Sequence, residues 1–90
     1  MHMKSLYDAF LLLKTTDELT NFLKDLCTPK EITEMQERWK VCQLLEHGDL
    51  SYRAIHKITG ASLTTIGRVA RFLKDEKYNG YKTALDRIKK

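Results

Sequence analysis

Apolar residues recur every three or four positions along almost the whole chain, which is the spacing of amphipathic α-helices. The alternation of apolar and polar residues that indicates β-strands does not persist in any segment. The first segment, residues 5–13, is apolar on nearly every side. Such a helix must be covered on all sides, and a chain of 90 residues has little material to cover it. We therefore expect this helix to be buried in a subunit interface.

Two further helices are predicted before the middle of the chain. Thr15 and Glu18 have the spacing of a capping box at the start of the second helix. The segment "TPKE", residues 28–31, begins the third helix with an N-cap threonine, a proline at the first helical position and a glutamate at the third. Gly48 suits the turn that ends this helix, which would be about 28 Å long. We expect the helices of residues 5–47 to form the dimerisation surface.

Two short helices and a final helix complete the pattern. The short helices span about Ser51–Ile58 and Leu63–Lys74, and the sequence "TGAS" joins them. The glycine in this joint can adopt a positive φ at little cost. Two short helices joined in this way form a helix-turn-helix, here over about residues 51–74. With a last amphipathic helix over about residues 81–89, the chain is expected to be a single all-α domain over residues 1–90.

The charged residues are distributed unevenly along the chain. Residues 1–50 carry 6 basic and 9 acidic side chains, whereas residues 51–90 carry 10 basic and 3 acidic ones. A domain with one basic end suits a polyanionic partner such as nucleic acid. A basic surface that is merely solvated is the alternative. Because a domain of this length is only marginally stable alone, the composition also favours an oligomer.

The second helix of the helix-turn-helix carries the side chains expected to contact DNA. Its first turns would enter a major groove, where hydroxyl groups can reach base edges or thymine methyl groups. Basic side chains on both helices can reach phosphates, which position a protein without specifying a sequence. His56 stands where many such motifs have a small alanine, which implies altered packing or an exposed position. The candidate DNA-contacting residues are Arg53, His56, Lys57, Ser62, Leu63, Thr64, Thr65, Gly67, Arg68 and Arg71.

The segment "LCTPKEITEMQERWKVCQLLEHGDLSYRAIHKITGASLTTIGRVARFLK" resembles the core of the Trp repressor family. The pattern of that family matches without gaps across residues 28–74, and it is most similar to the shorter YerC/YecD-type branch, which lacks an assigned ligand. The resemblance implies a six-helix Trp repressor-like fold in an intertwined homodimer. It also implies two recognition helices that read successive major grooves of a double-stranded DNA operator. We therefore expect a sequence-specific transcriptional regulator that acts as a repressor.

The same resemblance implies a ligand pocket. In the tryptophan-binding members two arginines flank the indole ring, and Arg38 and Arg68 match them. The glycine after the second arginine is Val69 here, and a serine near the ligand's amino group is Phe72. These side chains add bulk and remove a polar partner, so we expect no tryptophan corepressor; a different small effector is left open. Arg38 would then pair with a carboxylate such as Glu34, whereas Arg68 could face DNA, a ligand or an internal acid.

Neither catalytic nor metal-binding chemistry is indicated. His2, His47 and His56 lie far apart on different elements, and the chain has no metal-ligand spacing and no phosphate-binding glycine loop. Cys42 lies on the apolar stripe of the third helix, and Cys27 precedes a helix N-terminus, where a thiolate is favoured. Two cysteines do not form a disulfide framework, so we expect a reduced, cytoplasmic protein. No apolar run is long enough to cross a membrane.

Two other functions fit the same residues. The first is a nucleic-acid-binding module without sequence preference, and the second is a protein-interaction module that keeps the fold without binding DNA. Salt dependence together with a specificity ratio separates the first from a repressor. Charge reversal at Arg53, Lys57, Arg68 and Arg71 separates the second, because a protein partner would not require those charges.

Overall fold

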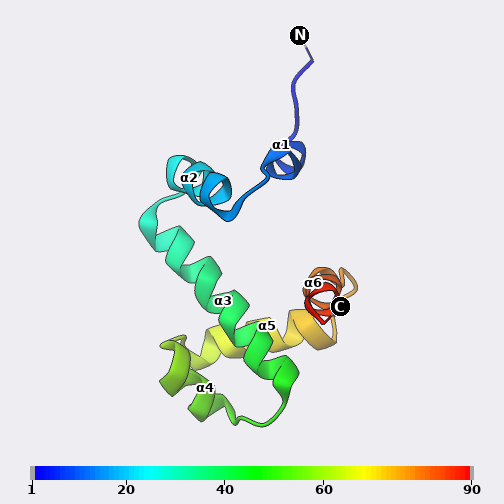
Figure 1. Cartoon of the computed structure of the whole chain (residues 1–90). Coiled ribbons are helices and arrows are strands. Elements are labelled where there is room, and N and C mark those ends of the chain that lie inside the picture. The colour runs from blue at the N-terminus through cyan, green and yellow to red at the C-terminus, as the bar shows by residue number, and fades with distance from the viewer. Residues whose placement is uncertain (1, 90) are drawn as a thin grey trace. The chain divides into compact units, whose positions relative to one another are not determined.

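The computed structural model describes residues 2–89, which form six α-helices and contain no β-strand (Figure 1). The all-α prediction is confirmed, and each predicted helix lies within about two residues of an observed one. The helices are α1 (Leu6–Leu12), α2 (Thr16–Leu26), α3 (Pro29–His47), α4 (Tyr52–Thr59), α5 (Leu63–Lys74) and α6 (Gly80–Ile88).

The chain divides into two compact units, Met1–Thr33 and Glu34–Lys90. The first unit contains α1, α2 and the first turn of α3. The second contains the rest of α3 together with α4, α5 and α6. A single domain over residues 1–90 remains a prediction.

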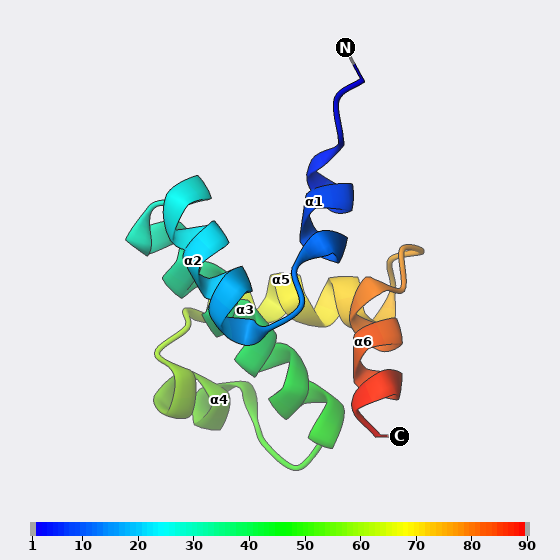
Figure 2. The same ribbon diagram turned by 45° about the horizontal axis from the view of Figure 1, so that its top comes forward.

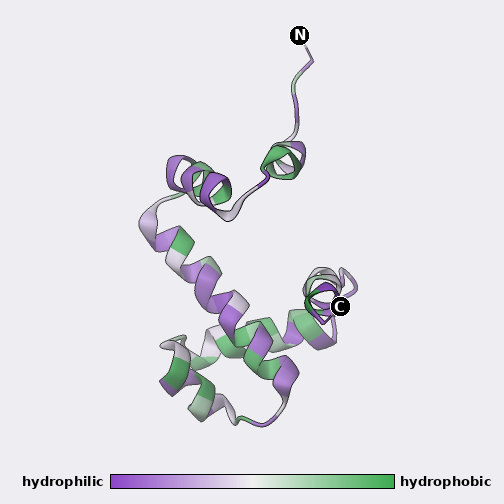
Figure 3. Ribbon diagram, viewed as in Figure 1, coloured by the Kyte–Doolittle hydropathy of each residue, from purple (hydrophilic) through white to green (hydrophobic). Residues whose placement is uncertain are grey.

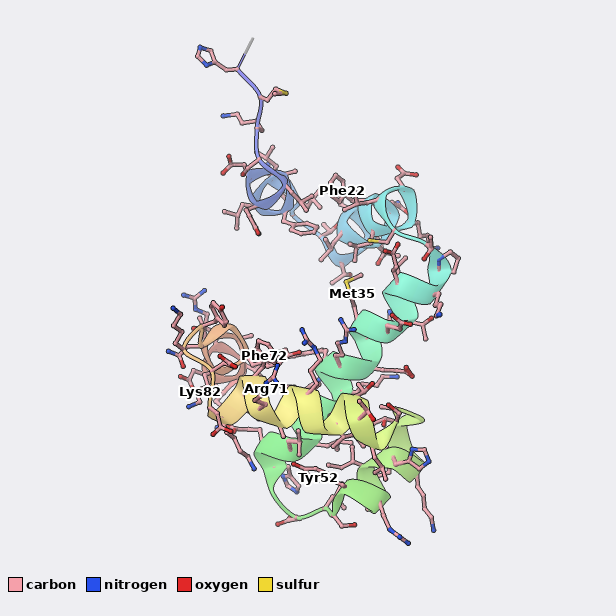
Figure 4. The ribbon with its side chains drawn as sticks, turned by 180° about the vertical axis from the view of Figure 1, so that it is seen from behind. Phe22, Met35, Tyr52, Arg71, Phe72 and Lys82 are labelled. Atoms are coloured by element: carbon pink, nitrogen blue, oxygen red, sulfur yellow. The ribbon has the colours of Figure 1, made fainter. Side chains whose placement is uncertain are left out.

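The first unit exposes most of its apolar side chains. Neither α1 nor α2 contains a buried residue, and Leu11 and Leu12 are 85% and 67% exposed. Its main aromatic contact joins Phe10 and Phe22, whose rings meet edge to face with centroids 5.6 Å apart; Figure 4 shows the Phe22 side chain directed toward α1. The helix that is apolar on nearly every side is therefore uncovered within this unit. Its burial in a subunit interface stays a prediction.

Side chains cap the N-terminal ends of α2 and α3 by hydrogen bonds to free backbone N–H groups. Thr28 Oγ1 accepts from the Glu31 backbone N–H at 3.2 Å, and the Glu31 carboxylate accepts from the Thr28 N–H at 2.8 Å. At α2, Thr15 Oγ1 accepts from the Glu18 N–H at 3.1 Å. The Glu18 carboxylate accepts from the N–H of Lys14 at 2.8 Å instead of closing back on Thr15. The box at α2 is thus shifted by one residue, whereas the box at α3 is complete.

The core of the second unit surrounds α5. In both Figures 1 and 2, α5 crosses the C-terminal half of α3. Helix α4 lies near the N-terminal end of α5, and α6 lies near its C-terminal end. Colouring by hydropathy shows the α5 ribbon apolar over much of its length (Figure 3). The buried cluster comes from all four of these helices and the turn before α5, and consists of Val41, Cys42, Ile55, Ala61, Ile66, Val69, Leu73 and Leu85.

The turn between α4 and α5 is closed by local hydrogen bonds. Gly60 has φ +77° and donates its backbone N–H to the His56 carbonyl at 2.8 Å. The Thr59 hydroxyl donates to the Ile55 carbonyl at 2.8 Å and accepts from the Ala61 N–H at 3.1 Å. The glycine therefore has the positive φ that the sequence pattern predicted, and the turn sets the direction in which α5 starts.

Two glycine substitutions on this motif should have opposite effects on stability. A Cβ at either Gly60 or Gly67 meets no atom within 4 Å, but only Gly60 has a positive φ. Gly60→Ala should therefore lower the free energy of unfolding by about 1–2 kcal/mol through backbone strain. Gly67→Ala, in the interior of α5, should raise it by about 0.5–1 kcal/mol. Urea unfolding of both variants measures this, and a shift of the same sign in both would contradict the assigned turn.

Candidate nucleic-acid interface

The start of α5 is held by its cap and by its inner face. The Ser62 hydroxyl accepts from the Thr65 backbone N–H at 3.1 Å, as expected of an N-cap. Ile66, Val69 and Leu73, one turn apart, are 0%, 1% and 4% exposed. The opposite side of the helix faces solvent, and its first turns expose Leu63, Thr64 and Gly67. This outward side carries Leu63, Thr64 and Gly67, three of the residues that the sequence predicts to contact DNA.

Six of the candidate residues line one cavity, which we call the helix-turn-helix cavity. Its volume is about 470 Å³, and its wall is more apolar than polar. Arg53, His56 and Lys57 come from α4, whereas Ser62, Leu63 and Thr64 come from the start of α5. The wall therefore combines cationic side chains with hydroxyl groups and one apolar side chain. The apolar one is Leu63, which is 52% exposed.

Thr65 lies on the α3 side of α5. It is half-buried and lines a separate polar cavity of about 310 Å³ with Ser62, Glu34, Glu37 and Arg38. Its hydroxyl accepts from the Ser62 hydroxyl at 3.1 Å. The structure therefore separates Thr65 from Leu63 and Thr64, and a base contact by Thr65 stays a prediction. Arg38 stands among carboxylates, as a structural role would require.

Arg68 and Arg71 share one aromatic ring at the far end of α5. Their guanidinium carbons lie 4.4 Å and 4.9 Å from the ring centroid of Phe72, and Figure 4 shows Arg71 and Phe72 at the end of α5 beside α6. Arg71 also lies 3.7 Å from the Glu76 carboxylate. The other partner of Phe72 is Tyr78, with the two rings stacked at 6.3 Å and 16°. Cation–π contact thus holds both arginines against the protein's own side chains.

A third cavity, the aromatic cavity, contains three of the four residues expected at a ligand pocket. Its volume is about 300 Å³ and it is lined by Arg68, Val69, Phe72, Tyr78, Gly80 and Tyr81. Arg38 belongs to the polar cavity instead. The sequence reasoning missed Tyr78 and Tyr81 at this place. Tyr81 was visible only as an apolar residue of the last helix, and no local pattern links Tyr78 to α5.

Tyr81 lies close enough to both Arg38 and Arg68, the two arginines of the expected pocket, for their charges to act on its phenol. Its ring stacks on Trp39 with centroids 6.4 Å apart and an interplanar angle of 29°. Burial raises the pKa of the Tyr81 phenol, and the neighbouring Cys42 thiol, when ionised, raises it further. The charges of Arg38 and Arg68 oppose this by lowering the pKa. Both arginines therefore act on one aromatic side chain of the chain itself.

His56 and the two cysteines lie in different surroundings. His56 is exposed, one of the two outcomes its size implied, and its Nδ1 lies 2.7 Å from the Ala61 carbonyl oxygen. Cys27 is half-buried and Cys42 is fully buried. Over residues 2–89 no group of three or more potential metal ligands occurs. Within that range no helix is both long and apolar enough to cross a membrane.

The arrangement of α4, the turn and α5 defines a helix-turn-helix protein. Comparison with known proteins specifies which kind, because residues 1–89 match the family described as Trp repressor protein. The chain belongs to the Trp repressor family, whose members are regulators rather than enzymes. This membership confirms the resemblance seen in the sequence.

Individual relatives agree with this assignment. The chain is 39% identical over 87 residues to the uncharacterized protein YerC of Bacillus subtilis (strain 168), covering 97% of this chain and 82% of that one. A TrpR-like protein from Eubacterium eligens ATCC 27750 has a TM-score of 0.87 at 37% identity, with 93% of this chain and 84% of that chain covered. A candidate Trp repressor from Staphylococcus aureus has the same TM-score and identity, with 93% and 82% covered. The Trp repressor-like fold is therefore confirmed.

The fully buried thiol of Cys42 should make the free energy of unfolding fall at alkaline pH. Burial raises the pKa of Cys42 from 9.0 to about 11, and the Glu46 carboxylate adds to the shift. The unfolded chain releases this proton at lower pH than the folded one, so the stabilisation is complete below pH 9.0 and is lost as pH rises toward about 11. Cys42→Ala should therefore show a smaller loss of unfolding free energy across this range.

Urea unfolding at a series of pH values measures this effect. Some loss should persist in Cys42→Ala, because the pKa values of Tyr81 and Lys89 are also raised. Cys27→Ala is the matched control and should keep the full decline of the unmodified protein. An equal decline in both variants would show that the Cys42 thiol is not responsible.

Proposed function

We propose that this protein is a sequence-specific DNA-binding transcriptional regulator, acting as a repressor, that uses α5 as its recognition helix. The main support for the proposal is that α5 is buried on one side and exposed on the other. Its inner side is buried through Ile66, Val69 and Leu73. Its first turns expose Leu63 and Thr64 beside the cationic side chains of the helix-turn-helix cavity.

The chemistry of this surface suits a major groove. Leu63 can contact a thymine methyl group, and the Thr64 hydroxyl can donate to or accept from base edges. Arg53 and Lys57 are exposed at the same cavity, where they can neutralise phosphates and fix the register of α5 on the duplex. Gly67 leaves open space on the helix, so the DNA backbone or a base can approach closely. Membership of the Trp repressor family supports this use of the motif.

A homodimer completes the proposal. The exposed apolar side chains of α1 and α2 include Tyr7, Leu11 and Leu12, which are 78%, 85% and 67% exposed. Exposed apolar side chains grouped in this way mark an interaction surface, and a second copy of the chain can bury them. Two copies related by a two-fold axis would place two recognition helices in successive major grooves of a palindromic operator. A cytoplasmic location follows from this role.

We further propose that DNA binding does not require tryptophan. The guanidinium carbon of Arg68 lies 4.4 Å from the ring centroid of Phe72, so an aromatic ring of the chain itself already contacts this guanidinium group. Tyr81 lies within the electrostatic reach of both Arg38 and Arg68. Val69, whose side chain forms part of the core, also lines the aromatic cavity. These contacts hold α5 in its place without a corepressor.

Charge reversal on α4 tests the DNA-binding face. The double variant Arg53→Glu/Lys57→Glu should bind duplex DNA at least about tenfold more weakly than the unmodified protein, with a shallower salt dependence. The matched control Lys77→Glu/Lys82→Glu changes the net charge by the same amount near α6 and should bind with nearly unchanged affinity; Figure 4 shows Lys82 on that helix. Fluorescence anisotropy over a range of salt concentrations measures both.

Selection from a pool of random duplexes distinguishes the competing functions. A two-fold symmetric motif, bound about a thousandfold or more tightly than random DNA, is expected of the unmodified protein and of the control variant. Equal binding to all duplexes would instead indicate a non-specific nucleic-acid module. No binding by the unmodified protein would indicate a protein-interaction module that keeps the fold.

A further inference from the structure

The His56 ring is fixed by the turn that precedes α5. Its Nδ1 lies 2.7 Å from the carbonyl oxygen of Ala61. A carbonyl oxygen only accepts hydrogen bonds, so Nδ1 must carry the hydrogen. In a neutral imidazole the other nitrogen, Nε2, is then a lone-pair acceptor. Because Ala61 is 2% exposed and follows Gly60 in a closed turn, this carbonyl holds the ring in one tautomer.

Nε2 is a hydrogen-bond acceptor in the wall of the helix-turn-helix cavity, to which the Thr64 hydroxyl also belongs. Arg53 and Lys57 in the same wall can only donate hydrogen bonds. The Ser62 hydroxyl is occupied, since it accepts from the Thr65 N–H and donates to the Thr65 hydroxyl. The exposed ring of His56 therefore adds an acceptor that the cationic side chains cannot supply.

The same wall also carries an apolar side chain. Leu63 is 52% exposed and lines the same cavity as His56. An acceptor and an apolar group that face one base pair together are complementary to an A·T pair in the major groove. Adenine offers the N6 amino group as a donor, and its thymine partner offers the C5 methyl group. A cytosine–guanine pair also offers an amino group, but it would place the guanine acceptors where Leu63 has no donor.

We infer that His56 and Leu63 together recognise one A·T base pair in each half of the operator, with His56 Nε2 accepting from adenine N6 and Leu63 contacting the thymine methyl. The inference rests on the proposed DNA-binding function and assigns one of its specificity contacts. It depends on the Ala61 carbonyl, because a ring with the hydrogen on Nε2 would donate and could not accept from the adenine amino group.

The tautomer can be measured without DNA. The ring ¹⁵N chemical shifts of His56 at mildly alkaline pH should show the hydrogen on Nδ1. A ring with the hydrogen on Nε2, or an even mixture of both forms, would overturn the inference while leaving the proposed DNA binding intact.

The base pair is tested with duplexes that carry the motif selected by the unmodified protein. At each A·T pair, thymine is replaced by uracil, which removes the methyl group, or adenine is replaced by purine, which removes the amino group. At one A·T pair of each half-site, each change should weaken binding of the unmodified protein about tenfold. If no such pair exists in a clearly selected motif, the inference is wrong although the protein binds specific DNA.

Two matched variants assign the contact to His56. In His56→Asn the amide nitrogen can replace Nδ1 at the Ala61 carbonyl, but no acceptor stands at the Nε2 position. In His56→Gln the amide oxygen can take the place of Nε2. Binding by His56→Asn should be insensitive to removal of the adenine amino group, whereas His56→Gln should keep the sensitivity. Leu63→Ala should lose only the sensitivity to the methyl group.

The opposite pattern would overturn the inference. If His56→Asn retains the full sensitivity to the adenine amino group, another side chain makes the contact. Lys57→Ala is the control, because loss of a phosphate contact should weaken all duplexes alike and preserve both sensitivities. Failure of the unmodified protein to select any motif would be a failure of the proposed function and not of this contact alone.

Discussion

The burial of one side of α5 is the constraint on which the second unit depends. Ile66, Val69 and Leu73 are almost completely removed from solvent, and each such aliphatic side chain contributes about 1.5–3 kcal/mol when fully buried. This packing fixes both the position of α5 and its rotation about its own axis. Helical geometry then determines which side of α5 is exposed. The buried residues therefore decide which residues are available to a partner.

The far end of α5 is stabilised by contacts of a different kind. The Phe72 ring contacts the Tyr78 ring and the guanidinium groups of Arg68 and Arg71. Tyr81, on α6, is close enough to Arg68 for the arginine charge to lower the pKa of the Tyr81 phenol. Aromatic side chains of the chain itself therefore line the cavity beside Arg68, the residue that matches a ligand-flanking arginine of the tryptophan-binding family members.

Local signals made the helices and their ends predictable. Thr28 and Ser62 cap helices because a hydroxyl at that position satisfies a free backbone N–H, and Gly60 takes the φ that other residues avoid. Contacts between distant segments were not predictable. The side of α5 on which Thr65 lies and the stacking of Tyr78 on Phe72 follow from tertiary packing. What covers the apolar surface of α1 was also not predictable from the sequence, and α1 contains no buried residue.

The most direct test is the affinity for the selected duplex at near-physiological salt, measured with and without millimolar L-tryptophan. If the protein's own side chains hold α5 in its DNA-binding position, the two affinities should be equal and both should be sequence-specific. Binding that appears only with tryptophan would contradict the roles given to Val69 and Phe72. Absence of sequence-specific binding under both conditions would contradict the role of α5 as a recognition helix.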